Sequence, residues 1–176
     1  QSDFTVRNVL EIIAMCTDDD GALLDIINLQ TEDDGVTPLM PACRDGSAPI
    51  VRLLLKKQAD IRLVAHNRSS ALVEACKGGH EDVATMLLEH DLEGAGVNRQ
   101  LDNGLTPLLA ACYSREGGLV SKLINAKANC DAQLDDRMTA VMIASMRGNA
   151  GAGAQLIEEL DKQQVAWKFV KNIHGK

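Results

Sequence analysis

The stretch Val36-Thr37-Pro38-Leu39 decides the fold, because its pattern returns three times along the chain. The Thr-Pro-Leu triplet or a close variant stands at 37–39, 70–72, 106–108 and 139–141, with spacings of 33, 36 and 33 residues. Each triplet is followed at a fixed distance by a pair of small residues, and further on by a pair of long aliphatic residues. They are Ala42-Cys43, Ala75-Cys76, Ala111-Cys112 and Ala144-Ser145, then Leu54-Leu55, Leu87-Leu88, Leu123-Ile124 and Leu156-Ile157. Such a period predicts a stack of small, similar units in place of one globular core.

Each period predicts two short helices. Thr37 is expected to cap the first helix, with Pro38 at the first helical position, where a missing N–H costs nothing. Asp45-Gly46 ends this helix, and Ser47 is expected to cap a second helix of apolar residues at helical spacing. All four prolines of the chain (38, 41, 49 and 107) fall at predicted helix starts. The segments between units are rich in Asp, Asn and Gly, which predicts projecting hairpin-like loops.

Composition narrows the classes of function. The chain has 176 residues, 45% of them hydrophobic and 2% aromatic, with a net charge of −7. Its basic residues are scattered, which argues against nucleic-acid binding. Because no run of 18 apolar residues exists, no membrane insertion is expected. The histidines lack metal-ligand spacing, and the glycine-rich stretch 148–153 follows no predicted strand. We therefore expect no metal, no cofactor and no enzyme activity.

Three of the five cysteines stand at the same repeat position, six residues after the Thr or Ser that opens each unit. Equivalent atoms of stacked helices lie roughly 8–10 Å apart, whereas a disulfide needs Cα atoms within about 7 Å. We therefore expect Cys43, Cys76 and Cys112 to be buried free thiols in a reducing intracellular compartment. The cytoplasm is the expected location, or an organelle interior if Gln1 is a processed N-terminus.

On these residues the sequence resembles the ankyrin repeat, a family of 33-residue units. The family motifs begin with T-P-L-H, continue with a G-H turn and end with A-D-V-N. The matching residues are Asp34-Gly35-Val36-Thr37-Pro38-Leu39, Gly79-His80, Ala59-Asp60-Ile61 and Val97-Asn98. The chain departs from the pattern because Met40, Val73, Leu109 and Met142 replace the His, and Arg68 and Arg137 replace a loop Gly. The resemblance implies an all-α repeat solenoid of stacked helix pairs with projecting loops.

The period also divides the chain, which we expect to be a single domain over residues 1–176. Residues 1–32 are expected to form an N-terminal cap of two helices. Four repeats follow at 33–65, 66–101, 102–134 and 135–162. Residues 163–176 form a C-terminal cap or tail.

The resemblance further implies that a protein partner binds the concave surface formed by the loops and the first helices. The family's contact positions lie four, three and one residues before the Thr, and seven and eight residues after it. In the first two units they are Asp33, Asp34, Val36, Arg44, Asp45, His66, Asn67, Ser69, Lys77 and Gly78. In the last two they are Asp102, Asn103, Leu105, Tyr113, Ser114, Asp135, Asp136, Met138, Met146 and Arg147. We call these residues the predicted concave surface.

Three features of these sites have two interpretations each. Tyr113 is either an anchor for the partner or an incidental amphipathic residue. The acidic loop tips either receive a basic partner or only form turns. Trp167 and Phe169 either form an exposed partner surface or fold back as a C-terminal cap.

The sequence therefore predicts a non-catalytic protein–protein interaction module that uses the concave surface. An alternative is a structural or accessory subunit that docks into a large intracellular assembly through its ends. A third hypothesis is a regulatory piece cut from a longer enzyme or receptor.

Overall fold

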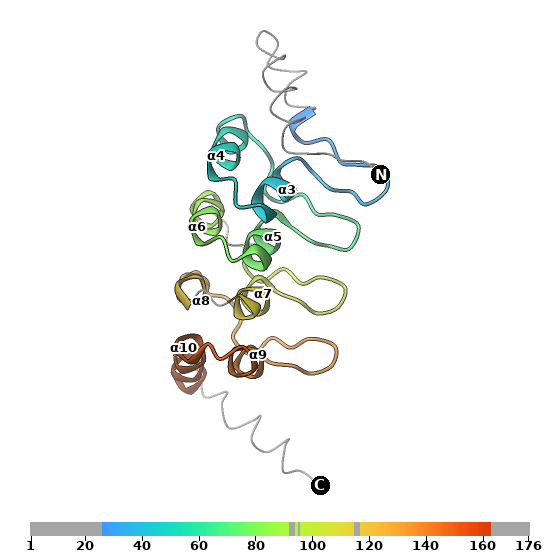
Figure 1. Cartoon of the computed structure of the whole chain (residues 1–176). Helices are drawn as coiled ribbons and strands as arrows, with labels where there is room; N and C mark the ends of the chain where they lie inside the picture. The colour runs from blue at the N-terminus through green and yellow to red at the C-terminus, as the bar shows by residue number, and fades with distance from the viewer. Residues whose placement is uncertain (1–25, 92–93, 95, 115–116, 163–176) are drawn as a thin grey trace.

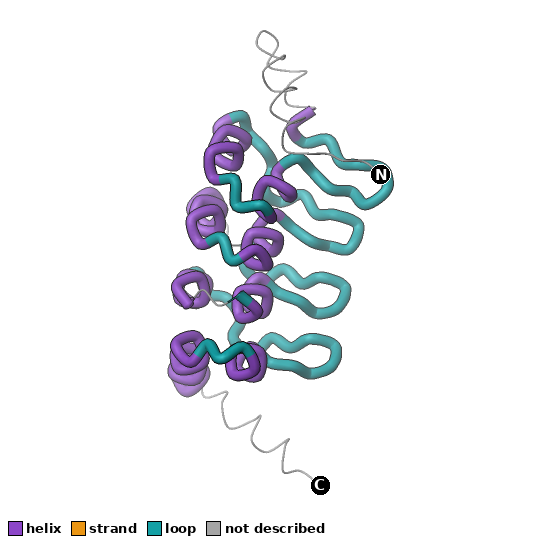
Figure 2. The backbone as a smooth tube through the Cα atoms, viewed as in Figure 1, coloured by secondary structure: helices purple, strands orange, loops and turns teal. Residues whose placement is uncertain are grey.

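The structure is a computed structural model that describes residues 26–91, 94, 96–114 and 117–162. In these residues, short helices pair and the pairs stack (Figure 1). The pairs are α3 (Leu39–Arg44) with α4 (Ala48–Lys56), α5 (Ala71–Gly78) with α6 (Glu81–His90), α7 (Pro107–Tyr113) with α8 (Gly117–Asn125), and α9 (Ala140–Met146) with α10 (Ala150–Lys162). Figure 2 shows that the first helices form one row, the second helices another, and that the loops project beside the first row. The predicted all-α repeat solenoid is confirmed.

Helix starts follow the predicted capping in three of the four units. The side chains of Ser70, Thr106 and Thr139 accept hydrogen bonds from the main-chain N–H three residues later, at 3.4, 3.2 and 3.3 Å. The predicted side-chain caps at Thr37 and Ser47 are wrong. α3 begins at Leu39, and the Thr37 main-chain carbonyl, not its hydroxyl, accepts from Met40 at 3.1 Å. The Ser47 carbonyl likewise accepts from the first turn of α4, and its side chain makes no cap bond.

The loops between units close as hairpins, as the sequence predicts. One main-chain bond recurs in the last three loops, from Ala65 to Ser69, Leu101 to Leu105 and Leu134 to Met138, at 2.9, 2.9 and 3.0 Å. Single antiparallel bridges flank two of these turns, at Val64–Ser70 and Gln133–Thr139. Neighbouring loops also bond to each other, because the His66 N–H donates to the Asp34 carbonyl at 2.8 Å and the Asp135 N–H to the Asn103 carbonyl at 3.3 Å. These bonds join the first loop to the second and the third loop to the fourth.

The core is continuous from unit to unit, as a stack requires. The first leucine of each aliphatic pair is almost fully buried, at 0, 2, 0 and 0% exposure for Leu54, Leu87, Leu123 and Leu156. Each first helix packs on the next, α3 on α5, α5 on α7 and α7 on α9. With few aromatic side chains, these layers are filled by aliphatic residues, alanine and cysteine. The predictions for most of the N-terminal cap and for 163–176 lie outside the described residues.

Candidate partner-binding surface

Most of the predicted concave surface is exposed. The exposed members are Asp33, Asp34, Arg44, Asp45, His66, Asn67, Lys77, Gly78, Asp102, Asn103, Asp135, Asp136, Met146 and Arg147. Val36, Tyr113, Ser114 and Met138 are half-buried. Two of the family positions are buried, since Ser69 and Leu105 are only 3% and 8% exposed. Ser69 is turned inward to bond Glu74, and Leu105 belongs to the core.

A groove lies between the first and second units on this surface. It encloses about 290 Å³. Its rim carries Asp33, Asp34, Arg44, His66 and Asn67, all of them predicted contact residues, and Val36 also lines it. The remaining lining comes from Met40, Pro41, Ala65, Ser69 and Glu74. The groove therefore combines an apolar part with a charged edge, which is the usual make-up of a recognition site.

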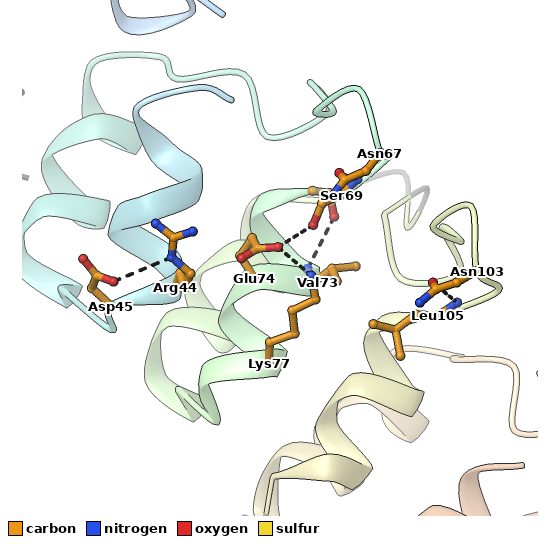
Figure 3. Close-up of polar contacts among 10 residues, drawn as sticks. Arg44, Asp45, Asn67, Ser69, Val73, Glu74, Lys77, Asn103 and Leu105 are labelled. Carbon is orange, nitrogen blue, oxygen red and sulfur yellow. Dashed lines mark hydrogen bonds and ion pairs between the residues drawn. The ribbon is translucent and has the colours of Figure 1, made fainter. Parts of the chain in front are cut away.

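Glu74 is the groove residue that sequence reasoning missed (Figure 3). Its Oε1 atom accepts from the Ser69 hydroxyl at 2.6 Å and from the Lys77 ammonium at 2.8 Å. Only 13% of its side chain is exposed. The equivalent residues of the other units are the buried Pro41, Ala110 and Ile143. The sequence did contain a signal for Glu74, because it is the one charged residue at a repeat position that is otherwise apolar. A carboxylate at a buried position requires polar partners.

The acidic and amide residues at the loop tips divide into two sets with different tasks. Three residues before the Thr or Ser, the side chains of Asn67, Asn103 and Asp136 each accept from a main-chain N–H two residues on, at 2.9, 3.2 and 3.0 Å. These bonds are Asx turns, which hold the loop shape. Of the acidic loop tips, Asp136 therefore forms a turn.

Four residues before the Thr, the first, third and fourth loops each carry an aspartate whose carboxylate is free within the described chain. The side chains of Asp33, Asp102 and Asp135 make no hydrogen bond or ion pair to any residue that the structure describes. Asp102 and Asp135 line a second, open hollow of about 690 Å³ together with Arg68 and Arg99. We call Asp33, Asp102 and Asp135 the acidic ladder.

Tyr113 lies at the end of α7, half-buried against the core. The guanidinium of Arg147 lies over its ring, 5.2 Å from the ring centroid, which is within cation–π range. Met146, beside Arg147, is 73% exposed. The third and fourth units thus present an aromatic, apolar and cationic group together, whereas the first two present Arg44 and Lys77 at the ends of their first helices.

The cysteines of the repeat position are buried, as predicted. Cys43, Cys76 and Cys112 are each 0% exposed and free, and Cys130 is also a buried free thiol. Burial, together with a smaller effect of the neighbouring Cys130, raises the pKa of the Cys112 thiol to about 12. Burial likewise raises the pKa values of Cys43 and Cys76. Because the thiolate is the reactive form, these side chains are not poised as nucleophiles.

No three His, Cys, Asp or Glu side chains of the described residues are grouped so that they could hold a metal ion. The candidate residues Trp167 and Phe169 lie outside the described part of the chain. Among the helices that the structure describes, none has the length and hydropathy that a membrane crossing needs.

Helix pairs stacked at a 33-residue period, with hairpin loops beside the first helices, define a repeat solenoid of the helix–turn–helix–loop class. A family model for ankyrin repeats, in three copies, matches residues 10–100. The chain belongs to the ankyrin-repeat family. Ankyrin repeats are in general protein–protein interaction modules.

Several proteins with ankyrin repeats are similar to the chain. It is 30% identical over 115 residues, 64% of its length, to the ankyrin repeat and KH domain-containing protein CBG24701 of Caenorhabditis briggsae. It is 42% identical over 57 residues, 32% of its length, to ankyrin repeat family A protein 2 of Mus musculus. It is 30% identical over 128 residues, 73% of its length, to the nuclear factor NF-kappa-B p105 subunit of Rattus norvegicus. The matches span 4, 18 and 12% of these three relatives.

Proposed function

We propose that the chain is a non-catalytic protein-binding module, and that its partner binds the predicted concave surface with a segment that enters the groove beside Glu74. The observation that carries this proposal is the groove itself. Residues chosen from the sequence as contact positions in two different units, among them Asp34, Arg44 and His66, line one hollow of about 290 Å³.

The charges on this surface favour a partner segment with cationic side chains. Arg44 and Lys77 already have carboxylate neighbours, since Arg44 lies 3.8 Å from Asp45 and Lys77 lies 2.8 Å from Glu74. The acidic ladder makes no ion pair with any described residue, although Arg68 and Arg99 line the same hollow as Asp102 and Asp135. A lysine or arginine of the partner would therefore gain charge-assisted hydrogen bonds there without displacing an existing pair. Complementary charge of this kind also accelerates the encounter of the two proteins.

The experiment compares two triple variants as baits for a partner captured from cell extract and identified by mass spectrometry. The first variant neutralises the acidic ladder (Asp33→Asn, Asp102→Asn, Asp135→Asn). The second makes the same change in charge on exposed residues of the second helices (Glu89→Gln, Glu158→Gln, Asp161→Asn). We expect a protein that binds the unchanged chain to be lost from the ladder variant and retained by the control. Equal binding to both variants would contradict the concave surface as the binding site.

The alternative, a subunit that docks through its ends, has one observation in its favour. At the end of the stack that α9 and α10 form, Met142 and Ile157 are 43% and 48% exposed. Loss of the captured protein from the second variant, with binding kept by the ladder variant, would support this alternative, because Glu158 and Asp161 lie on α10.

The four free cysteines of the described residues also suit a reducing compartment, since disulfides form and persist in oxidising ones. We therefore propose that the module works inside the cell, where a buried thiol can replace a small apolar residue in the core.

A further inference from the structure

Glu74 has one carboxylate oxygen that the described chain does not use. Its Oε1 atom accepts both of the hydrogen bonds made by this side chain, from the Ser69 hydroxyl and the Lys77 ammonium (Figure 3). Its Oε2 atom accepts none from any described residue. Among these residues the one buried side-chain atom without a partner is Nδ2 of Asn149. Oε2 is therefore open to solvent, and the hollow that Glu74 lines is the groove.

Of the four equivalent positions in the repeats, only the second holds a carboxylate. The other three are the buried apolar residues Pro41, Ala110 and Ile143. The two donors on Oε1 offset part of the cost of burying a charge. They also hold the carboxylate of Glu74 in one orientation. The row of first helices thus presents a single fixed carboxylate at a position that is otherwise apolar.

The charges that line the groove are mostly negative. The lining holds three carboxylates and one guanidinium, which belong to Asp33, Asp34, Glu74 and Arg44. The guanidinium of Arg44 lies 3.8 Å from Asp45. The imidazole of His66, which also lines the groove, has its Nδ1 atom 3.2 Å from the main-chain oxygen of Asp33. A cationic group is therefore attracted into the groove, and an anionic group is repelled from it.

Apolar side chains line the groove as well, from Met40, Pro41 and Ala65. Lysine and arginine match such a mixed lining, because their hydrocarbon stems cover apolar surface while their charged heads reach polar atoms. An aliphatic side chain would cover the same wall but would leave Oε2 of Glu74 without a donor. Aspartate or glutamate would bring a second negative charge to that oxygen. The lining thus selects a long cationic side chain.

We propose that Glu74 anchors one lysine or arginine of the partner, whose stem lies against the apolar wall and whose head donates a hydrogen bond to Oε2. This inference rests on the proposed function and names the residue type that the entering segment carries. Because the other three units are apolar at this position, the anchor also fixes the unit against which that basic residue lies. Glu74 therefore sets the register of the partner along the stack.

The probe is a random-peptide library displayed on phage and selected on the full chain. Calorimetry then gives the dissociation constants of the retained peptides for the unchanged chain, Glu74→Gln and Glu89→Gln. The last variant makes the same change on an exposed residue of α6 and is the matched control. Peptides that the ladder variant fails to bind are the ones that occupy the concave surface.

We expect each of these concave-surface peptides to carry one lysine or arginine whose replacement by methionine weakens binding to the unchanged chain about tenfold or more. Glu74→Gln should weaken binding of the original peptide to a similar extent, and Glu89→Gln should not. The methionine peptide should bind Glu74→Gln and the unchanged chain alike, because either change alone removes the same interaction.

A second variant, Glu74→Leu, gives this position an apolar side chain like those of the other units. It should remove the preference for the basic residue over methionine, and circular dichroism of both variants shows whether their helices remain. The methionine peptide tests the basic residue on the unchanged chain, so that part of the result does not depend on how the variants fold.

The outcomes separate this inference from the proposed function. Concave-surface peptides that lack a basic residue coupled to Glu74 would overturn the anchor and leave the proposed function standing. Peptides that bind the ladder variant as tightly as the unchanged chain lie outside the concave surface, and both proposals would then fail. A library from which the chain retains no peptide would also contradict both.

Discussion

The Nε2 atom of His80 lies 2.9 Å from the main-chain oxygen of Arg44 and donates a hydrogen bond to it across two units. His80 precedes α6, whereas Arg44 ends α3. The imidazole ring fills the space between Gly46 and Gly78, where a Cβ atom on either glycine would collide with it. Gly46 also has φ at +69°, which favours glycine. The Gly-His turn thus joins the first unit to the second.

Replacing His80 by alanine should lower the free energy of unfolding by about 1–3 kcal/mol, because the Arg44 carbonyl loses its donor. Urea titration followed by circular dichroism measures this change. His90→Ala is the control, since His90 is an exposed residue at the end of α6, and such changes usually stay within about 0.5 kcal/mol. Equal effects of the two substitutions would show that the inter-unit bond does not stabilise the stack.

Leu87→Ala should cost about 2–5 kcal/mol, because it removes a buried side chain and leaves a cavity. Leu87 is 2% exposed and occupies the same position as the fully buried Leu54 and Leu123. The midpoint of urea unfolding gives the effect. Leu29→Ala provides the comparison, since Leu29 is 60% exposed and its truncation should change stability little. A small loss of stability in Leu87→Ala would mean that the surrounding side chains move to fill the cavity.

The period predicted the scaffold well because burial in a stack repeats with the chain. Leu54, Leu87 and the cysteines could be assigned to the core from spacing alone, and the loops followed from Asp, Asn and Gly. The prediction of side-chain caps at Thr37 and Ser47 was wrong, because the hydroxyl and the main-chain carbonyl of each residue compete for the same N–H. Spacing does not decide that competition.

The candidate site was harder to predict for a related reason. The family positions treat all loop-tip residues alike, yet Asp136 closes its own turn and Asp135 does not. That distinction depends on loop conformation and not on residue type. Ser69 was placed on the surface, but its hydroxyl turns inward to Glu74. Glu74 itself could have been found, since a charge at an otherwise buried apolar position requires an explanation.

Arg68→Gly should stabilise the protein by about 0.5–1 kcal/mol, because a left-handed conformation strains a side chain with a Cβ atom. Arg68 has φ at 64°, and Arg137 has φ at 66° at the same place in its loop. Urea unfolding again measures the change. Arg68→Lys keeps the strained Cβ and the charge, and should leave stability unchanged. If the glycine variant is no more stable than the lysine variant, the left-handed backbone at Arg68 does not strain this loop.

Stability should fall at alkaline pH because of the buried thiols. Burial raises the pKa of Cys112 from 9.0 to about 12, so between these values the unfolded chain loses this proton and the folded chain keeps it. The contribution is fully present below pH 9 and is lost as pH rises toward 12, by about 1.4 kcal/mol per pH unit for one thiol. Cys112→Ala removes it. Urea titrations at several pH values above 9 should therefore give a shallower decline for this variant than for the unchanged chain. The two proteins differ only at residue 112, and equal slopes would mean that Cys112 ionises as readily in the folded state as in urea.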